Sequence, residues 1–318
     1  MAADFRYFKN GDLPVDGLWH CGRFGQLIKT EPWNCYMPWF RIAPHVYQVS
    51  GYMNNGSYLI DTGEGLILVD APQFEMLYLQ FESIRNAGFD PKDIKQIWIT
   101  HSHGDHFNAA RAIHEYTGAD IVVGRDCWIG YKERMERGSL GAMPCPPISQ
   151  FEPDKYFEDM IPFSMGRFKF DMEFHNGHCR GSLVFFFDDT DEETGKTYRV
   201  GMHGGIGECG MWNVLQAGDP VEHYYQYINE CRELAKLDVD ITLYSHENQI
   251  NAHTAVNPDD PMDYSEFVNR DVWRNLMNEK ADDCERRSDP NDKGSFAGNK
   301  QEMAKKAAEE AAAKEAGK

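Results

Sequence analysis

The sequence predicts an α/β fold, and three observations support this prediction. Short apolar runs rich in β-branched residues alternate with stretches of helical spacing through the middle of the chain. Glycine and asparagine, which are typical turn residues, separate several of these runs. With 318 residues, of which 42% are hydrophobic and 13% aromatic, the chain can bury one large core, alone or with appendages. We therefore expect helices layered on a β-sheet.

The first half of the predicted domain combines short strands with two helices. Apolar residues recur at helical spacing in residues 73–89, and Gly88 is a typical stop signal. A second helix is predicted over residues 108–116. The predicted strands of this half, which are β-rich runs bounded by turn residues, are 41–49, 56–60, 65–69, 97–100 and 120–124.

The second half follows a less regular stretch at residues 125–165, which includes a conspicuous loop at 138–147. Polar and apolar residues alternate with period two over residues 167–174, which predicts a strand, and residues 190–196 are predicted as a hairpin tip. The remaining predicted elements are strands at 183–187, 198–202 and 240–244 and helices at 220–237 and 263–287.

These elements predict one domain over residues 39–287 with a segment on either side. Residues 1–38 lack clear periodicity, and we expect an extended arm packed on the domain. Its expected anchors are Trp19, Trp33 and Trp39. Residues 288–318 begin with a linker composition and end in an Ala/Glu/Lys-rich stretch without an apolar face, which predicts a solvent-exposed tail. An oligomerisation helix is the alternative, so a homo-oligomer stays open.

Composition narrows the classes of partner and compartment. The 32 basic and 51 acidic residues give a net charge of −19, which argues against nucleic acid or an anionic membrane as partner. No stretch approaches the ~20 apolar residues of a membrane span, and the first residues lack the apolar core of a signal peptide. The eight cysteines contain no C-x-x-C pair and are expected to be free thiols. We expect a cytoplasmic protein that acts on a small molecule.

The chemistry is concentrated in one motif directly after the predicted strand at 97–100. His101 and His103 project to the same side of an extended segment, so they can share one metal ion. Gly104 allows the backbone to turn, which would aim Asp105 and His106 at a second ion. Imidazole and carboxylate groups suit zinc. The spacing H-x-H-x-D-H therefore predicts a metal site at a strand end.

This motif resembles the signature of the metallo-β-lactamase superfamily. Val69-Asp70 is similar to the family's early strand that ends in aspartate, Gly177–Ser182 resembles its G-H-x-x-G-S element, and Tyr244–His246 resembles the late strand that delivers a histidine. Order and spacing fit from about Phe40 to Asn251. The ligand set is most similar to the third lactamase subclass, which uses only histidine and aspartate. The resemblance implies a four-layer αββα sandwich.

The resemblance also implies two zinc ions per chain, with iron or manganese in the same ligands left open. The implied ligands are His101, His103 and His178 for one ion and Asp105, His106 and His246 for the other. Asp70 is implied to hold a ligand loop by hydrogen bonds without binding metal. A hydroxide between the two ions is the implied nucleophile, and Asp105 would orient it as the catalytic carboxylate.

The segment Met202–Gly207 departs from the resembled pattern. Many superfamily members, including thioesterases and iron redox proteins, place a metal-bridging aspartate here, and this chain has none. The third subclass typically has serines here that bind the lactam carboxylate, whereas this chain has glycines. The candidate substrate contacts are His203, Arg180 and Gly205. A packed strand-end histidine is the alternative for His203, and a structural ion pair is the alternative for Arg180.

The sequence thus predicts a zinc-dependent hydrolase that cleaves an acyl C–N or C–O bond, in a β-lactam-like cyclic amide or a lactone. An amidase, lactonase or esterase that does not act on β-lactams is the alternative within this fold. An iron-dependent oxidoreductase is the alternative from another class, and the missing bridging carboxylate argues against it.

Overall fold

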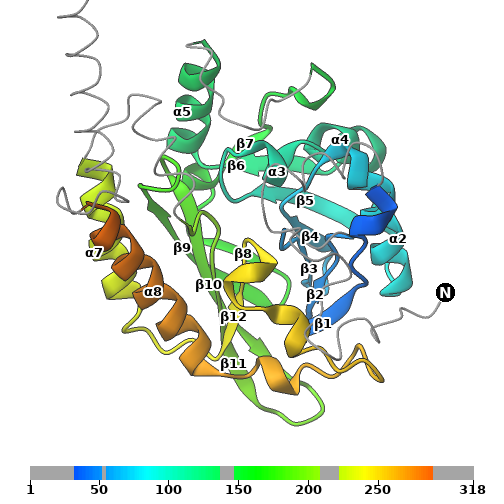
Figure 1. Ribbon diagram of the computed structural model, residues 1–318. Coiled ribbons are helices and arrows are strands. Elements are labelled where there is room, and N and C mark those ends of the chain that lie inside the picture. Colours follow the sequence, from blue (N-terminus) through cyan, green and yellow to red (C-terminus); the bar gives the residue numbers. More distant parts are fainter. Residues whose placement is uncertain (1–31, 52–54, 137–146, 208–221, 289–318) are drawn as a thin grey trace, which may run out of the picture.

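The computed structural model describes residues 32–51, 55–136, 147–207 and 222–288. Two β-sheets pack face to face in the middle of the molecule, and helices cover the outer face of each sheet (Figure 1). The predicted four-layer αββα sandwich is therefore confirmed. Among the described residues, no helix is long and apolar enough to cross a membrane.

The first sheet has seven strands that follow one another in chain order. Strands β1 to β4 are antiparallel neighbours, whereas β4 to β7 run parallel. The parallel arrangement brings the carboxyl ends of β4 and β5 to the same edge, with Val69 beside Trp98. The strands are β1 Phe40–Ala43, β2 Val46–Gln48, β3 Tyr58–Asp61, β4 Leu66–Val69, β5 Ile94–Ile99, β6 Asp120–Val123 and β7 Lys155–Tyr156.

The second sheet has five strands in the order β12-β11-β10-β9-β8. Strands β8 to β11 form an antiparallel meander, and β12 joins β11 in parallel. The predicted hairpin tip at 190–196 is confirmed as the turn between β10 and β11. The strands are β8 Phe163–Met165, β9 Phe168–His175, β10 Ser182–Thr190, β11 Thr197–His203 and β12 Ile241–Leu243.

The outer layers consist of two groups of helices. Helices α2 Leu77–Asn86, α4 Ala110–Thr117 and α5 Arg125–Glu136 cover the first sheet, and α7 Glu222–Leu234 and α8 Arg270–Ser288 cover the second. The short helix α3 Gly104–Phe107 belongs to the predicted metal motif. Single 3-10 turns are η2 Pro32–Cys35, η3 Phe74–Met76, η4 Pro91–Asp93, η5 Pro147–Ser149, η6 Phe157–Asp159, η7 Glu247–Gln249, η8 Ala252–Thr254 and η9 Ser265–Phe267.

Alternation along the strands explains why their sequences are apolar without interruption. In β10, Phe185 and Phe187 face the core between the sheets, whereas Val184 and Phe186 face α7 and α8. Each central strand is buried on both faces, so both of its side-chain rows are hydrophobic. Trp98 on β5 is fully buried between the sheets and contacts four phenylalanine rings with centroids at 4.8–5.6 Å.

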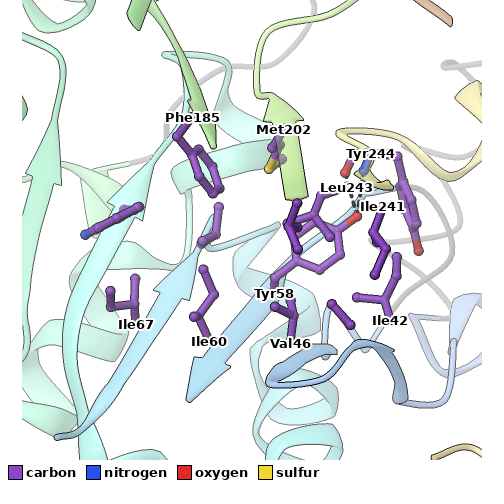
Figure 2. Packing of buried hydrophobic residues seen from close by; sticks show 14 of the residues in the cluster. Ile42, Val46, Tyr58, Ile60, Ile67, Phe185, Met202, Ile241, Leu243 and Tyr244 are labelled. Atoms are coloured by element: carbon purple, nitrogen blue, oxygen red, sulfur yellow. Dashed lines mark hydrogen bonds between the residues drawn. The ribbon is translucent and has the colours of Figure 1, made fainter. Parts of the chain in front are cut away.

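A pair of tyrosines joins the two sheets close to the end that carries His246. The Tyr58 hydroxyl donates to the carbonyl of Tyr244 at 2.8 Å and accepts from its amide at 2.9 Å (Figure 2). A Cβ at Gly56 would lie 2.0 Å from the same carbonyl, so only glycine fits there. The segment after β12 is thereby fixed against the first sheet.

Three predicted elements are corrected. Residues 41–49 form the hairpin β1–β2 rather than one strand, because the chain turns at Pro44-His45. The stretch 125–165 contains the twelve-residue helix α5. The last helix begins at Arg270 rather than 263, because Val268 pairs with Ile241 in a β-bridge and Asn269 then caps the helix by accepting from the Asp271 amide.

The predicted arm and tail are described only in part. Residues 1–31 and 289–318, including Trp19, lie outside the described residues. Cys35 and Met37 are buried in the core between the sheets, and Trp39 packs against the first sheet's outer core. Trp33 is 60% exposed, so it does not anchor the arm as expected.

Candidate metal centre

The H-x-H-x-D-H segment is fixed at the carboxyl end of β5 by backbone hydrogen bonds. The His106 amide donates to the His103 carbonyl at 2.9 Å, which closes the first turn of α3. The Ala71 amide donates to the His106 carbonyl at 2.8 Å, which ties this turn to the end of β4. The neighbouring parallel strands therefore determine where the four side chains of the motif point.

The first group of candidate ligands consists of His101, His103 and His178. One nitrogen from each ring lies within 4.8 Å of the other two. His178 comes from the turn between β9 and β10, and its Nε2 lies 3.2 Å from Nε2 of His101. Its Nδ1 lies 2.8 Å from the carbonyl oxygen of Gly207, which can only accept. Nδ1 of His178 therefore carries the proton, and Nε2 has the lone pair that a metal ion requires.

The second group consists of Asp105, His106 and His246, whose ligand atoms also lie within 4.8 Å of one another. The Nε2 atoms of His106 and His246 are 3.3 Å apart. Oδ2 of Asp105 lies 3.6 Å from the first of these nitrogens and 3.7 Å from the second. The six residues that the sequence placed in two sets are thus brought together in the same two sets.

Asp70 hydrogen-bonds His106 through Nδ1, the ring nitrogen other than the one that lies near His246. Its Oδ2 accepts from His106 Nδ1 at 2.7 Å and from the Thr100 hydroxyl at 2.8 Å, and its Oδ1 accepts from the Thr100 amide at 2.8 Å. These bonds leave Nε2 of His106 facing the second group. Asp70 itself has φ +61°, a left-handed conformation that aspartate tolerates better than most residues.

Electrostatics keep the histidines of the first group neutral and Asp105 charged. Burial, followed by the other histidines, lowers the pKa of His101 and His178 well below the ordinary value. Burial also lowers the pKa of His103 to about 4. Burial alone would raise the pKa of Asp105, but the neighbouring His106, His246 and His103 outweigh it and lower the pKa to about 2. Neutral imidazoles and an ionised carboxylate are the forms that bind metal ions.

Asn55 is part of the site and was missed by the sequence interpretation. Its side-chain amide is buried and donates to the backbone carbonyl of Asp105 at 3.0 Å and to Oδ2 of Asp105 at 3.2 Å. Its backbone forms a β-bridge with His246. The contacts join segments fifty and more residues apart, and nothing near Asn55 in the sequence signals them.

Gln249 fixes the segment that carries His246. Its side-chain oxygen accepts from the amides of Ser245 and His246 at 3.0 and 3.1 Å, and its side-chain nitrogen donates to the Ile206 carbonyl at 2.6 Å. Gln249 therefore holds the His246 segment against the glycine-rich segment after β11, which accepts the hydrogen bond from His178.

The three predicted substrate contacts lie in different surroundings. Gly205 is buried beside the first group, and a Cβ there would lie 2.3 Å from the Ser182 hydroxyl. The Arg180 guanidinium forms ion pairs with Asp126 and Glu133 of α5 at 3.8 and 3.3 Å.

His203 is 1% exposed and belongs to neither ligand group. Its ring lies 5.9 Å from the ring of Tyr227 on α7 and 5.5 Å from that of His175. Neither ring nitrogen has a hydrogen-bond partner among the described residues. Burial, followed by His175, lowers the pKa of His203 well below its ordinary value, so the ring is neutral.

Two sheets between helical layers, with two groups of candidate metal ligands at one end, are the arrangement of an αββα-sandwich metalloprotein. The family model of the metallo-beta-lactamase superfamily matches residues 54–246, which is more than half of the chain. The chain therefore belongs to the metallo-β-lactamase superfamily, as the sequence motifs indicated.

Solved structures of this family are similar over most of the chain. The metallo-β-lactamase GOB-18 from Elizabethkingia meningoseptica is 27% identical with a TM-score of 0.65, over 80% of this chain and 93% of that one. A β-lactamase from Chitinophaga pinensis is 25% identical with a TM-score of 0.67, over 80% and 95%. The class B3 di-zinc metallo-β-lactamase LRA-12 from an Alaskan soil metagenome is 25% identical with a TM-score of 0.65, over 80% and 96%.

Curated relatives match over a shorter segment. A UPF0173 metal-dependent hydrolase from Rhizobium leguminosarum bv. trifolii is 32% identical over 101 residues, which is 28% of this chain and 39% of that protein. A metal-dependent hydrolase of the same name from Rhizobium johnstonii is 30% identical over the same shares. The chain thus spans about two fifths of the length of the curated relatives that it matches.

Proposed function

We propose that this protein is a hydrolase that binds two zinc ions and cleaves an acyl C–N or C–O bond of a small molecule. The observation that carries the proposal is the convergence of ring nitrogens and a carboxylate in two adjacent groups. Nε2 of His178 faces Nε2 of His101 at 3.2 Å, and Nε2 of His106 faces Nε2 of His246 at 3.3 Å beside the Asp105 carboxylate. Nitrogen pairs this close need a proton or a cation between their two atoms, and two such pairs beside a carboxylate suit two metal ions.

The residues of both groups fit zinc. Each group supplies three nitrogen or carboxylate ligands, which leaves one position of a tetrahedral ion open for water or substrate, the pattern of a catalytic site. The similar enzyme LRA-12 is a di-zinc metallo-β-lactamase, which supports the count of two. Iron or manganese in the same ligands is the alternative that metal analysis decides.

Zinc bound in these groups would lower the pKa of a coordinated water toward about 7 and polarise the acyl carbonyl. The chain's own contribution is orientation. Asp105, whose pKa of about 2 keeps it ionised at neutral pH, accepts a hydrogen bond from the attacking water. Asp70 holds His106, and the Gly207 carbonyl holds His178, so the two groups keep their relative positions.

One observation favours an amide, lactone or ester that is not a β-lactam. The resembled subclass typically has serines in the segment that is Met202–Gly207 here, and at position 205 of this chain a side chain would collide with Ser182. A substrate contact at this position would come from the Gly205 backbone. A cyclic amide or lactone remains the proposed substrate class, with β-lactam turnover as one test of it.

The test combines metal analysis with turnover of a cephalosporin, a carbapenem and a homologous series of lactones. We expect about two zinc ions per chain, and hydrolysis of at least one of these substrates that a chelator abolishes. His101→Ala and Asp105→Ala should each lower kcat by at least about 100-fold, because each removes a ligand. His114→Ala, a histidine on α4 outside both groups, is the matched control. Full turnover by His101→Ala would contradict the proposed mechanism.

A further inference from the structure

Helix α5 contacts both segments that carry the first ligand group. A Cβ at Gly181 would lie 2.8 Å from the Cys127 amide nitrogen, so the end of the His178 turn touches the first turn of α5. The Arg180 side chain packs against Gly130, and its guanidinium pairs with Glu133 at 3.3 Å. The next residue of the helix, Arg134, reaches the other segment at Ser102.

Arg134 is 7% exposed, and its guanidinium lies against Ser102. Its Nη2 donates to the Ser102 carbonyl at 3.3 Å and also to the Ser102 hydroxyl. Ser102 stands between His101 and His103 in the chain. The Ser102 hydroxyl contacts Arg134 and Cys179, neither of which is a candidate ligand. Arg134 therefore fixes this segment through its hydrogen bonds to Ser102.

Ser102 links the same contact to the third ligand. Its hydroxyl donates to Sγ of Cys179 at 3.8 Å, and Cys179 directly follows His178. Ser102 and Cys179 are both buried. The hydrogen-bonded series Arg134, Ser102 and Cys179 thus includes a sequence neighbour of each residue of the first group. None of the three belongs to the second group.

Burying a guanidinium is costly unless it makes strong hydrogen bonds, so a buried arginine with a fixed partner is a specific structural feature. The geometry points to Arg134 as a positioning residue that sets the spacing of His101, His103 and His178 and thereby the affinity of the first metal ion. This inference rests on the proposed two-metal site. Partners of metal ligands typically change metal affinity by 10–100-fold when they are removed.

The experiment measures the two stepwise zinc affinities by competition with a chelating indicator. For Arg134→Met, we expect one affinity to fall about 10–100-fold and the other to stay within about threefold of wild type. Arg134→Lys keeps a donor that can reach Ser102 and should recover most of the lost affinity. Arg125→Met is the matched control, because Arg125 lies on the same helix and pairs with Asp159 on the surface.

Two ligand-deletion backgrounds assign the effect to a site. With His246→Ala, which breaks the second group, Arg134→Met should weaken the remaining ion and shift the visible absorption of the cobalt-substituted protein. With His178→Ala, which breaks the first group, it should leave the remaining ion unchanged. If Arg134→Met does not fold, Ser102→Ala takes its place, since it removes the hydroxyl that joins Arg134 to Cys179.

The outcomes separate the inference from the proposed function. Wild-type protein that binds no metal would overturn the proposed function together with this inference. Wild-type protein that binds two ions, with both affinities unchanged in Arg134→Met, overturns the inference alone. Equal weakening of both ions also overturns it, because it would mean a general loss of stability rather than positioning of the first group.

Discussion

Asp70 shows how one residue outside the ligand set can control a ligand. Its carboxylate accepts three hydrogen bonds, two from Thr100 and one from His106, and the residue has a left-handed backbone conformation. Burial raises its pKa, although His106 and the Thr100 hydrogen bonds act in the opposite direction. A buried carboxylate in a strained conformation is typical of a functional site, because the surrounding structure must hold it there.

We predict that Asp70→Asn weakens metal binding at the second group by about 10–100-fold. Asparagine tolerates the left-handed backbone, so the fold is retained, but it offers one acceptor oxygen where aspartate offers two. A buried donor of Thr100 or His106 then loses its partner, which costs about 1–3 kcal/mol of stability. Zinc competition and chemical denaturation measure the two effects. Asp61→Asn, at the end of β3 and outside both groups, is the control, and unchanged zinc affinity in Asp70→Asn would refute this role.

At the scale of elements, the strands were predictable because their side-chain pattern is local. Runs such as Leu66–Val69 and Ser182–Thr190 are apolar on both faces, and their flanking turns are visible in the sequence. Helix α5 was missed because its buried positions include a glycine and an arginine as well as Trp128 and Tyr131, so it shows no apolar stripe. The start of α8 was missed because a tertiary contact, the bridge of Val268 with Ile241, prevents an earlier start.

The candidate site shows the same difference between local sequence patterns, which are predictable, and tertiary contacts, which are not. The H-x-H-x-D-H segment is contiguous, so four candidate ligands could be read from it, and the family resemblance supplied His178 and His246. Asn55 and Arg134 reach the site only through the packing of distant segments, and an arginine or asparagine in a helix or loop has no local feature that indicates such contacts. The sequence therefore indicates the ligands, whereas the structure shows what holds them.

A prediction at the scale of elements concerns the segment after β11. A Cβ at Gly205 would lie 2.3 Å from Oγ and 2.7 Å from Cβ of Ser182. We expect Gly205→Ser to destabilise the protein by about 1–3 kcal/mol, as overpacking typically does. Combining it with Ser182→Gly should restore part of this loss, since the colliding atoms are removed. The measurement is the midpoint of denaturant unfolding.

Gly130→Ala is the matched control for that substitution. Its Cβ would meet only the flexible Arg180 side chain at 3.4 Å, and alanine favours a helix by up to about 1 kcal/mol relative to glycine. It should therefore leave stability unchanged or raise it. A Gly205→Ser protein as stable as wild type would show that the segment can move aside and that position 205 can present a side chain to a substrate.

At the scale of the whole molecule, the candidate metal centre brings together groups that bind different numbers of protons in the folded and the unfolded states. His101, His103 and His178 have lowered pKa values in the folded protein, so the unfolded chain binds more protons than the folded one between about pH 4 and the ordinary value of 6.5. Stability of the metal-free protein must therefore fall as the pH falls through this window. His106, whose pKa is raised against burial by Asp105 and Asp70, adds stability below pH 6.5 that is lost as pH rises through its folded value.

We predict that metal removal lowers the midpoint of thermal unfolding and that the metal-free protein loses further stability between pH 6.5 and pH 4. The shift of His103 alone, from 6.5 to about 4, corresponds to at most about 3 kcal/mol, because one pKa unit is about 1.4 kcal/mol. Denaturant unfolding of chelator-treated protein at pH 7, 5.5 and 4.5 measures the slope. His103→Asn should flatten it, because the unfolded chain then has one fewer proton to bind, whereas His114→Asn serves as the surface control. A metal-free protein equally stable at pH 7 and pH 4.5 would mean that these rings are solvated and charged. The proposed function depends on buried, neutral histidines, so this result would contradict it.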